Sequence, residues 1–536
     1  MGALFRLLHA AYVLTREGVV SLLAPPDPPP MGRLALRIAR WVERPDAARQ
    51  SGAARLAKVL DRLGPSYIKL GQFLATRPDI VGPVVAQELT LLQDSMPPFS
   101  IREAKTTIRE TLDADADVLF EELSPPLAAA SIAQVHRAGI AMPATGGVAP
   151  DADFELPALA GRKQVAVKIL RPGVEQRFAR DLESFYLAAR LAERLVPKLR
   201  RLRPVAVVDT LARTVELEMD LRLEAAALSE MAENVADDDG FRVPLVDWRR
   251  SGRRVLTLDW VDGIKLSNAQ ALREAGVDLP ALAQNIIQSF LRHALRDGFF
   301  HADMHQGNLF VDTEGRLVAV DCGIMGRLGV EERRFLAEIL YGFIRRDYRR
   351  VAEVHFEAGY VPAGQDVDMF AQALRAIGEP LQGNAAKDIS MARLLTQLFE
   401  VTELFDMHTQ PQLILLQKTM VVVEGVARSF DPDLNMWTTA EPVVRGWIVE
   451  HLGPSARLGQ AGEGIKAIGR LVNELPALAD RAESFSKELG RMSRDGVRLD
   501  AATVEALAAA RARHGRSTRT ALWVIAILLG LIYLAI

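Results

Sequence analysis

The 536-residue chain is long enough for two or three domains, each with its own hydrophobic core. Hydrophobic residues make up 49% of it and charged residues 25%, and the formal net charge of -3 excludes both a disordered chain and a basic surface for a nucleic-acid partner. The single cysteine, Cys322, excludes a disulfide framework and is typical of a reducing, cytoplasmic setting.

The N-terminal stretch MGALFRLLHAAYVLTREGVVSLLAPP is apolar, but three charged residues interrupt it: Arg6, Arg16 and Glu17. A secretory signal needs an unbroken apolar centre, so no signal peptide is predicted. Phe5, Leu8, Tyr12 and Leu14 are loosely compatible with an amphipathic helix, which could lie on a membrane surface. A helix packed against its own protein is the simpler interpretation of the same pattern.

Three regions follow one another along the chain. Residues 1–120 are predicted to form a helical extension with a Pro-rich break at 25–30. Residues 121–265 mix short β-branched runs with helices around a predicted surface loop at 141–162. Residues 266–510 are predicted to be mostly helical, with short strands near Asn308–Val311 and Leu317–Val320. A strand-rich lobe followed by a helical lobe predicts an α+β, two-lobed fold.

The C-terminal run ALWVIAILLGLIYLAI, Ala521–Ile536, contains no charge and follows the basic segment RARHGRSTR. At about 1.5 Å per residue the run is slightly short of a bilayer core, unless Thr518 and Thr520 extend it. The run lacks the polar face of a surface helix in a soluble domain. The sequence therefore predicts a membrane anchor at 518–536, with the basic flank and the active domain on the cytoplasmic side.

Lys168, in KQVAVKIL, is the first candidate for phosphate chemistry, because a strand can hold a lysine against nucleotide phosphates. Taken alone, it is more simply a surface lysine at a strand end. Glu224 lies in ELEMDLRLEAAALSE, which is rich in strong helix formers, and could pair with Lys168. A solvent-exposed helix face with several acidic residues explains that segment equally well.

FFHADMHQGNLF and VAVDCG contain the strongest chemical signal, since a loop places Asp303 and Asn308 five residues apart and Asp321 follows a second strand. Asp303 could orient an attacking hydroxyl or water, while Asn308 and Asp321 offer oxygen ligands suited to Mg²⁺. His301 and His305 raise the alternative of a zinc site, which the open oxygen-rich ligand set disfavours. The pattern predicts metal-assisted transfer of a phosphoryl group from ATP.

The chain has no G-x-G-x-x-G loop, and the segment LAAASIAQVH stands before Lys168 where such a loop is required. Alanines keep the small volume of glycines but stiffen the backbone, so nucleotide preference and turnover should differ from those of an ordinary kinase. The predicted nucleotide-contact residues of this alanine-rich loop are Leu127, Ala128, Ala129, Ala130, Ser131, Ile132, Ala133, Gln134 and Val135.

Together, LAAASIAQVH, VAVK, HADMHQGN and DCG resemble the UbiB family of atypical protein-kinase-like proteins. The upstream segment GPSYIKLGQFLATRPDI looks like that family's K-x-G-Q signature, with Lys69, Gly71 and Gln72. The resemblance covers roughly residues 55–430, and the motifs come in the family's order. It implies a two-lobed kinase-like fold with a helical N-terminal extension and a membrane-seeking tail.

The resemblance also implies a role for each motif residue. Lys168 would bind the nucleotide, Glu224 would pair with it, Asp303 would be the catalytic aspartate, and Asn308 and Asp321 would bind the metal. Glu218 and Asp220 would contact Lys69 of the extension, which covers the place where a protein kinase admits a peptide. The remaining predicted site residues are Gln72 beside Lys69 and, at the end of the run RRVLTLDWV, the nucleotide contacts Asp259 and Val261.

Several positions depart from kinase or family patterns. Ala302 stands where the kinase H-R-D motif has arginine, Met304 and Gln306 replace common prolines, and Cys322 replaces the aromatic residue of D-F-G. No A-P-E follows, so the activation segment that docks peptides is predicted to be missing. Lys69 and Gln72, three residues apart, would share one face of a helix.

The resemblance implies an ATPase or phosphotransferase that uses ATP and Mg²⁺ to support ubiquinone (coenzyme Q) biosynthesis. It implies residence in the inner (cytoplasmic) membrane, with one or a few spans and the catalytic domain facing the cytoplasm. The expected partners are membrane lipid, isoprenoid quinone intermediates and ubiquinone biosynthetic enzymes, and a homodimer is left open. Two alternatives also remain open: a non-catalytic nucleotide-binding scaffold, and a true kinase for a small molecule or protein.

Overall fold

The computed structural model describes, apart from a few single residues, the ranges 2–22, 39–44, 50–75, 96–140, 163–195, 202–379, 404–407 and 411–453. The chain divides into two compact units, 1–448 and 449–536. The predicted Pro-rich break, surface loop and C-terminal anchor lie outside the described ranges. The helices and strands with described bounds lie in the first unit, except that α20 crosses the division.

The N-terminal extension consists of short helices around a small apolar core. They are α1 (Ala3–Arg16), α2 (Val19–Leu22), α4 (Gly52–Leu63) and α5 (Pro65–Ala75). Val19, Val59 and Ile68 are buried in this core. Gly64 turns the chain from α4 into α5 with φ +94°, and a Cβ there would lie 2.1 Å from the guanidinium of Arg177. Glycine is needed at this turn for both backbone conformation and space.

A buried carboxylate fastens the end of α1 to its neighbours. Glu17 is only 1% exposed and pairs with Arg62 at 2.5 Å, Arg44 at 3.3 Å and Lys58 at 3.5 Å. Burying a carboxylate is costly unless cations or hydrogen bonds compensate it. The cluster therefore holds α1, α4 and the segment 39–44 together.

The first helix, α1, carries apolar residues on two opposite faces. It packs against α4 and α10, where Ala10 and Val13 are buried. Leu4, Leu8 and Tyr12 remain exposed by 59%, 60% and 49%. The prediction of a helix packed on its own protein is thus met by one face only, and the other presents apolar side chains outward.

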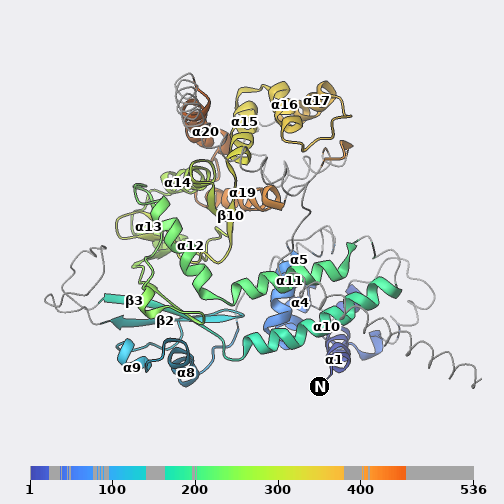
Figure 1. Ribbon diagram of the computed structural model, residues 1–536, viewed down its shortest axis with the longest axis vertical. Coiled ribbons are helices and arrows are strands. Elements are labelled where there is room, and N and C mark those ends of the chain that lie inside the picture. Colours follow the sequence, from blue (N-terminus) through green and yellow to red (C-terminus); the bar gives the residue numbers. More distant parts are fainter. Residues whose placement is uncertain are drawn as a thin grey trace, which may run out of the picture. The chain divides into compact units, whose positions relative to one another are not determined.

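A four-stranded antiparallel sheet forms the core of the first lobe. Its strands, in spatial order, are β1 (Ala128–Ala129), β2 (Ala133–Ile140), β3 (Lys163–Leu170) and β5 (Val255–Asp259). The helices α8 (Ile101–Leu112) and α9 (Ala116–Leu119) lie on one face of β2 and β3 (Figure 1). Ser100 and Glu103 form a reciprocal capping box that begins α8.

Three helices follow β3 in the chain: α10 (Val174–Leu195), α11 (Pro204–Glu218) and α12 (Leu221–Asn234). The long helix α10 packs against α1, α5 and α11. Tyr67 of α5 meets Phe185 of α10 edge-to-face at 5.0 Å, and Arg6 of α1 donates to Ser184 at 3.1 Å. The extension is therefore attached to the lobe through α10.

A second sheet and a strand pair frame the motifs of the helical lobe. The sheet contains, in order, β4 (Phe241–Arg242), β9 (Leu317–Ala319), β8 (Leu309–Asp312) and β6 (Gly263–Lys265). The pair contains β10 (Met325–Arg327) and β7 (Phe299–His301). The short strands predicted near Asn308–Val311 and Leu317–Val320 are thus confirmed as β8 and β9. They form an antiparallel hairpin.

Helices make up the rest of this lobe. They are α13 (Ala269–Glu274), α14 (Leu279–Arg292), α15 (Val330–Arg345), α16 (Tyr348–Glu357), α17 (Val367–Gly378), α19 (Pro411–Phe430) and α20 (Met436–Leu452). A π-helical turn, His293–Asp297, extends α14 and ends at Gly298. Phe370 and Tyr348 are fully buried among α15, α16 and α17, and α14 packs against α19.

The structure confirms the predicted α+β class, with a strand-rich part followed by a mainly helical part. Within the described ranges, no helix is both long and apolar enough to span a bilayer. The transmembrane helix predicted at 518–536 lies outside these ranges.

Asp238 gives a pH-dependent test of the fold. Burial opposes ionisation, but hydrogen bonds from His293 and Arg296 hold the pKa of this carboxyl well below its ordinary value of 3.8. A lowered pKa in the folded state gives stability that is present above pH 3.8 and lost below it. We expect Asp238→Asn to cost about 1.5–3 kcal/mol at pH 7, and the difference from wild type to shrink below about pH 4.

Urea titrations of both proteins between pH 3 and pH 7 would measure this difference. Asp237→Asn is a matched control, because the neighbouring Asp237 is exposed. A loss of the same size at pH 3 and pH 7 would show that the network does not depend on the charge of Asp238.

Candidate nucleotide and metal site

Side chains alternate between the two faces of β3, which places Lys168 on the face opposite to the apolar core. Val165, Val167 and Ile169 are fully buried against α8 and α9. Side chains along a strand point to alternate faces, so Lys168 emerges on the other side. Its neighbours in the ladder are Val135 of β2 and Leu256 of β5. The lysine therefore comes from the middle of a paired strand, which fixes its backbone.

The structure brings Lys168, Glu224 and Asp321 together. Lys168 Nζ lies 2.8 and 2.9 Å from the two carboxylate oxygens of Glu224 and 3.2 Å from Asp321 Oδ2. Glu224 is in the first turn of α12, whose N-terminus is capped by Asp220 through the backbone N–H of Arg222. The predicted pairing of Lys168 with Glu224 is present, and the lysine also contacts the predicted metal aspartate.

Two carboxylates around one ammonium group set the charges of this triad. Burial alone would lower the pKa of Lys168, but Asp321 and Glu224 raise it above its ordinary value. Burial raises the pKa of Glu224 to about 7 despite the nearby Lys168. Burial also opposes ionisation of Asp321, yet Lys168 and the Gly323 N–H hold its pKa well below its ordinary value. Near neutral pH the ammonium and Asp321 are charged, while Glu224 is partly protonated.

The predicted catalytic loop between β7 and β8 is held by its own hydrogen bonds. Asp303 N donates to His301 Nδ1 at 3.0 Å, and Asn308 Nδ2 lies 3.2 Å from Asp303 O and 3.4 Å from Asp303 Oδ2. His301 is 1% exposed, burial lowers the pKa of its ring, and its Nδ1 serves as the acceptor for the Asp303 N–H. The five-residue spacing of Asp303 and Asn308 thus closes a compact loop.

Asp321 is joined to this loop through the strand end before it. Val320 N donates to Asn308 O at 3.0 Å, and Asp321 Oδ1 accepts from Gly323 N at 3.0 Å. The Asp321 side chain is 42% exposed, whereas that of Lys168 is 19% exposed. Asp321 is therefore oriented at one oxygen yet remains accessible to a ligand.

The residues present fit a magnesium ion better than zinc. Asp321, Asn308 and Asp303 offer carboxylate and amide oxygens, and Mg²⁺ is usually held by one or two carboxylates together with water and phosphate oxygens. Within the described ranges no three histidine, cysteine or acidic side chains cluster to hold a metal by themselves. Cys322 is 1% exposed, and burial raises the pKa of its thiol, so it packs as an apolar side chain.

The alanine-rich loop forms the hairpin of β1 and β2 beside Lys168. Its tip closes with a hydrogen bond from Ala130 N to Ala133 O, at 2.8 Å. From Ser131 onward the tip is buried, whereas Leu127 is 57% exposed. Gln134 is fully buried and bonds to the main chain of Phe99. Its side chain is thus occupied, and any nucleotide contact at this position falls to the backbone.

Asp259 and Val261 lie where the chain leaves β5. The Asp259 side chain pairs with Lys163 at 2.6 Å, and Trp260 N donates to Gln164 O at 3.1 Å. Val261 is half-buried. These contacts fix the segment to β3. The contact of either residue with a nucleotide stays a prediction.

The extension reaches the site region through Lys69. Its ammonium lies 2.6 Å from Glu218 Oε2, and both side chains are mostly buried. Asp220 caps α12 and pairs with Arg222 at 2.6 Å, so its predicted contact with Lys69 stays a prediction. Gln72 is half-buried one turn along α5 from Lys69, and its catalytic role also stays a prediction.

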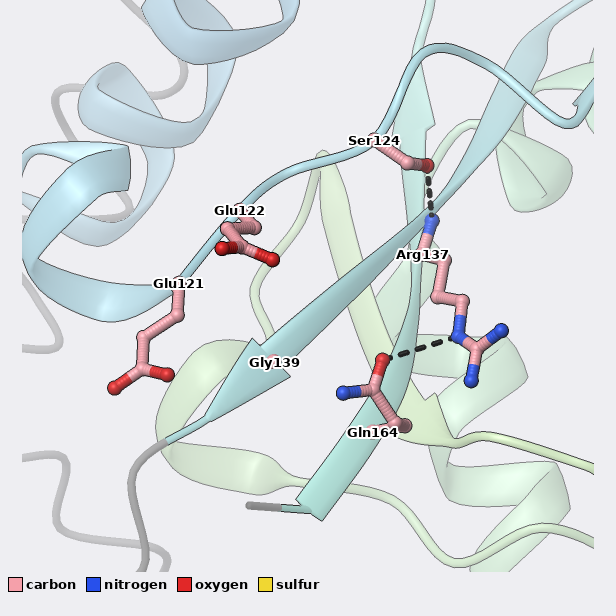
Figure 2. Close-up of a pocket in the computed structure, with 6 residues that line it drawn as sticks. All are labelled: Glu121, Glu122, Ser124, Arg137, Gly139 and Gln164. Carbon is pink, nitrogen blue, oxygen red and sulfur yellow. Dashed lines mark hydrogen bonds between the residues drawn. The ribbon is translucent and has the colours of Figure 1, made fainter.

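A separate hollow of about 260 Å³ lies at the far end of β2 and β3, away from the alanine-rich tip (Figure 2). Arg137 lines it, donates to Gln164 at 3.0 Å and stacks on the Trp260 ring at 4.7 Å. Glu121 and Glu122 line it as well. None of its lining residues belongs to the Lys168 triad or the catalytic loop, so it is not the candidate site.

Sequence reasoning missed residues that support the loops from distant parts of the chain. Thr419 Oγ1 of α19 donates to Ala302 O at 3.1 Å, and Gln306 Nε2 donates to Ser429 Oγ at 2.8 Å. Arg171 binds the carbonyls of the alanine-rich tip. Two of these contacts join residues more than 100 positions apart, and no local pattern signals them.

In kinase-like proteins, the phosphate site consists of a lysine on a strand, a glutamate on a helix and an aspartate beside the catalytic loop. The triad of this chain has the same three kinds of residue. Comparison with known families agrees with this class. The chain matches the ABC1 atypical kinase-like domain over residues 91–147 and 157–355 and the UbiB helical domain over residues 374–435.

Known relatives cover most of the chain. A "Probable protein kinase UbiB" of Pseudomonas putida (strain F1) is 38% identical over 457 residues, 84% of this chain and 80% of the relative. The protein of the same name from Pseudomonas entomophila is 37% identical over 500 residues, 91% and 88% of the two chains. The chain therefore belongs to the UbiB family of ABC1 atypical kinase-like proteins, which confirms the resemblance of its motifs.

A solved structure of a Mycobacterium tuberculosis protein, the Rv3197–erythromycin complex, is 22% identical and covers 77% of this chain and 98% of its own. Its TM-score is 0.44, which is too low to carry an argument about fold or function.

The ion pair between Lys69 and Glu218 is expected to stabilise the docking of the extension. A double-mutant cycle with Lys69→Ala and Glu218→Ala should give a coupling free energy of about 1.5–3 kcal/mol, because both charges are largely removed from water. Urea titrations of the four proteins measure it.

Lys105 and Asp117 form a matched control, since they pair at the same 2.6 Å but are 41% and 77% exposed. Their cycle should give below about 1 kcal/mol. Equal coupling in the two cycles would show that the extension does not rely on the Lys69 pair.

Proposed function

We propose that the chain binds ATP with Mg²⁺ and promotes transfer of the γ-phosphoryl group, chiefly to water. The observation that supports this most is the triad in which Lys168 lies between Glu224 and Asp321. A non-catalytic scaffold would not need these three residues to contact one another, nor the Asp303–Asn308 loop to lie beside them. We therefore favour the enzyme over the non-catalytic scaffold.

The residues divide the work by their chemistry. Lys168 carries a fixed positive charge for the nucleotide phosphates, and Glu224 orients it. Asp321 and Asn308 would hold Mg²⁺, which supplies neutralisation of the negative charge on the phosphates. Asp303 would accept a hydrogen bond from the attacking water or hydroxyl group and so orient it. Its own position is held because its backbone N–H donates to His301 and its carbonyl accepts from Asn308.

The segment after Asp321 argues against a protein substrate. The strand β10 ends at Arg327 and α15 begins at Val330, so only Leu328 and Gly329 separate them. This leaves no length for a segment that docks a peptide. The ion pair of Lys69 with Glu218 also holds the extension against α11. Water or a small acceptor fits this arrangement better than a folded protein.

Membrane association and a role in ubiquinone biosynthesis complete the proposal. Membership of the UbiB family supports the pathway. The exposed apolar side chains of α1, together with the uncharged run Ala521–Ile536, support contact with the inner membrane from the cytoplasmic side. ATP turnover would then act on isoprenoid quinone intermediates in the membrane or on the enzymes that process them, and a homodimer stays an open alternative.

Asp321→Asn should abolish Mg²⁺-dependent ATP hydrolysis, with a fall of about 100-fold or more, because the amide removes the charge that binds the metal. Phosphate release from the full chain in lipid vesicles, with and without Mg²⁺, measures it. Asp237→Asn, at an exposed position, should keep wild-type turnover. Turnover unchanged by Asp321→Asn would sink the proposed metal site and leave the scaffold alternative.

The pathway is tested in a strain that lacks the gene. We expect isoprenoid quinone intermediates to accumulate, and the wild-type chain to restore ubiquinone whereas Asp303→Asn does not. A chain without Ala521–Ile536 should restore it poorly and move to the soluble fraction. Normal ubiquinone without the gene would refute the pathway, and an unchanged membrane fraction after truncation would refute the anchor.

A further inference from the structure

Arg171 holds the carbonyl groups at the tip of the alanine-rich loop. It directly follows β3, and its own backbone N donates to Ile132 O at 2.7 Å. Its guanidinium donates through Nε to Ser131 O at 3.3 Å and through Nη2 to Ala130 O at 3.1 Å. One residue thus binds three consecutive carbonyls of the tip.

This arrangement also fixes the direction of the tip's amide groups. In a trans peptide the C=O of one residue and the N–H of the next point in opposite directions. Since Arg171 binds the carbonyls of Ala130 and Ser131, the N–H groups of Ser131 and Ile132 are turned away from its guanidinium. Successive amides that point the same way form a concave site for anions.

The position of the tip relative to the triad suits a phosphate contact. Val135 of the loop pairs with Lys168, and Ala133 pairs with Leu170, two residues further along β3. The tip therefore lies about two residues further along the sheet than the lysine that is proposed to bind phosphates. A nucleotide held by Lys168 would bring its phosphates close to the amides that point away from Arg171.

The segment Met96–Phe99 of the N-terminal extension, just before α8, supports the other side of the loop. Phe99 N donates to Gln134 Oε1 at 3.0 Å, and Gln134 Nε2 donates back to Phe99 O at 3.2 Å. Met96 N donates to Ala129 O at 3.1 Å, and Arg171 Nη1 donates to Pro97 O at 3.1 Å. The guanidinium also stacks on the Phe99 ring at 5.4 Å.

We propose that Arg171 is a positioning residue for a nucleoside triphosphate: it binds the tip carbonyls, and thereby presents the Ser131 and Ile132 amides to the phosphates. This inference rests on the proposed ATP site. Gln134 adds to this support, because it joins the loop to the segment Met96–Phe99. The loop and this segment then form one rigid unit above the proposed phosphate position, whereas a glycine-rich loop would be flexible there.

The test uses two substitutions that separate orientation from charge. Arg171→Lys keeps the positive charge but loses the planar fork that binds two neighbouring carbonyls, and Arg171→Met loses both. We expect either variant to bind Mg²⁺-ATP about tenfold more weakly. Adenosine, which has no phosphate, should bind as to wild type. Isothermal titration of the full chain in detergent measures both ligands.

Arg254→Lys is a matched control, because Arg254 lies on the same lobe and pairs at the surface with Glu110, at 3.1 Å. It should leave both affinities unchanged. Unchanged melting temperatures would show that the Arg171 variants keep their fold, and if Arg171→Met does not fold, Arg171→Lys decides the result.

Three outcomes would overturn the inference. Full ATP affinity in Arg171→Lys would mean that charge alone matters. An equal loss of ATP and adenosine affinity would mean that Arg171 only supports the fold. A wild-type chain that binds neither ligand would refute the proposed function as well, whereas ATP binding that is indifferent to Arg171 refutes this inference alone.

Discussion

The rest of the site depends on the two ion pairs of the Lys168 ammonium group. It comes from the centre of β3 and binds Glu224 of α12 and Asp321, which follows β9 of the other sheet. Burial raises the pKa of Glu224 to about 7, although the Lys168 ammonium beside it acts in the opposite direction. Lys168 therefore joins α12 to the strand end that carries the predicted metal ligand Asp321.

The extension is joined to this triad within a very short stretch of chain. Glu218, at the end of α11, binds Lys69 of α5, while Asp220 caps α12 and Glu224 holds Lys168 one turn later. Any shift of α5 would thus act on the first turn of α12. At the same time, Met96–Phe99 binds the alanine-rich loop. The extension therefore contacts both the helix that orients the lysine and the loop beside it.

Local patterns were sufficient to predict the parts of the site that one segment builds by itself. The β-branched run KQVAVKIL predicts a strand that holds Lys168, and FFHADMHQGNLF predicts a loop that carries Asp303 and Asn308 next to a strand. The contacts of Arg171 and Thr419 were missed, because each pairs with carbonyl groups that sequence does not distinguish. Tertiary packing decides such partners.

The residue at the kinase arginine position, Ala302, has a further consequence. Its carbonyl accepts from Thr419, and Gln306 on the other side of Asp303 donates to Ser429, so the middle and the C-terminal end of one helix, α19, both hold the predicted catalytic loop. In a protein kinase, a phosphate on the activation segment communicates with this loop through the arginine. Here α19, which lies in the part of the chain that matches the UbiB helical domain, holds the loop on both sides of Asp303. A shift of α19 would therefore move the loop at two points at once.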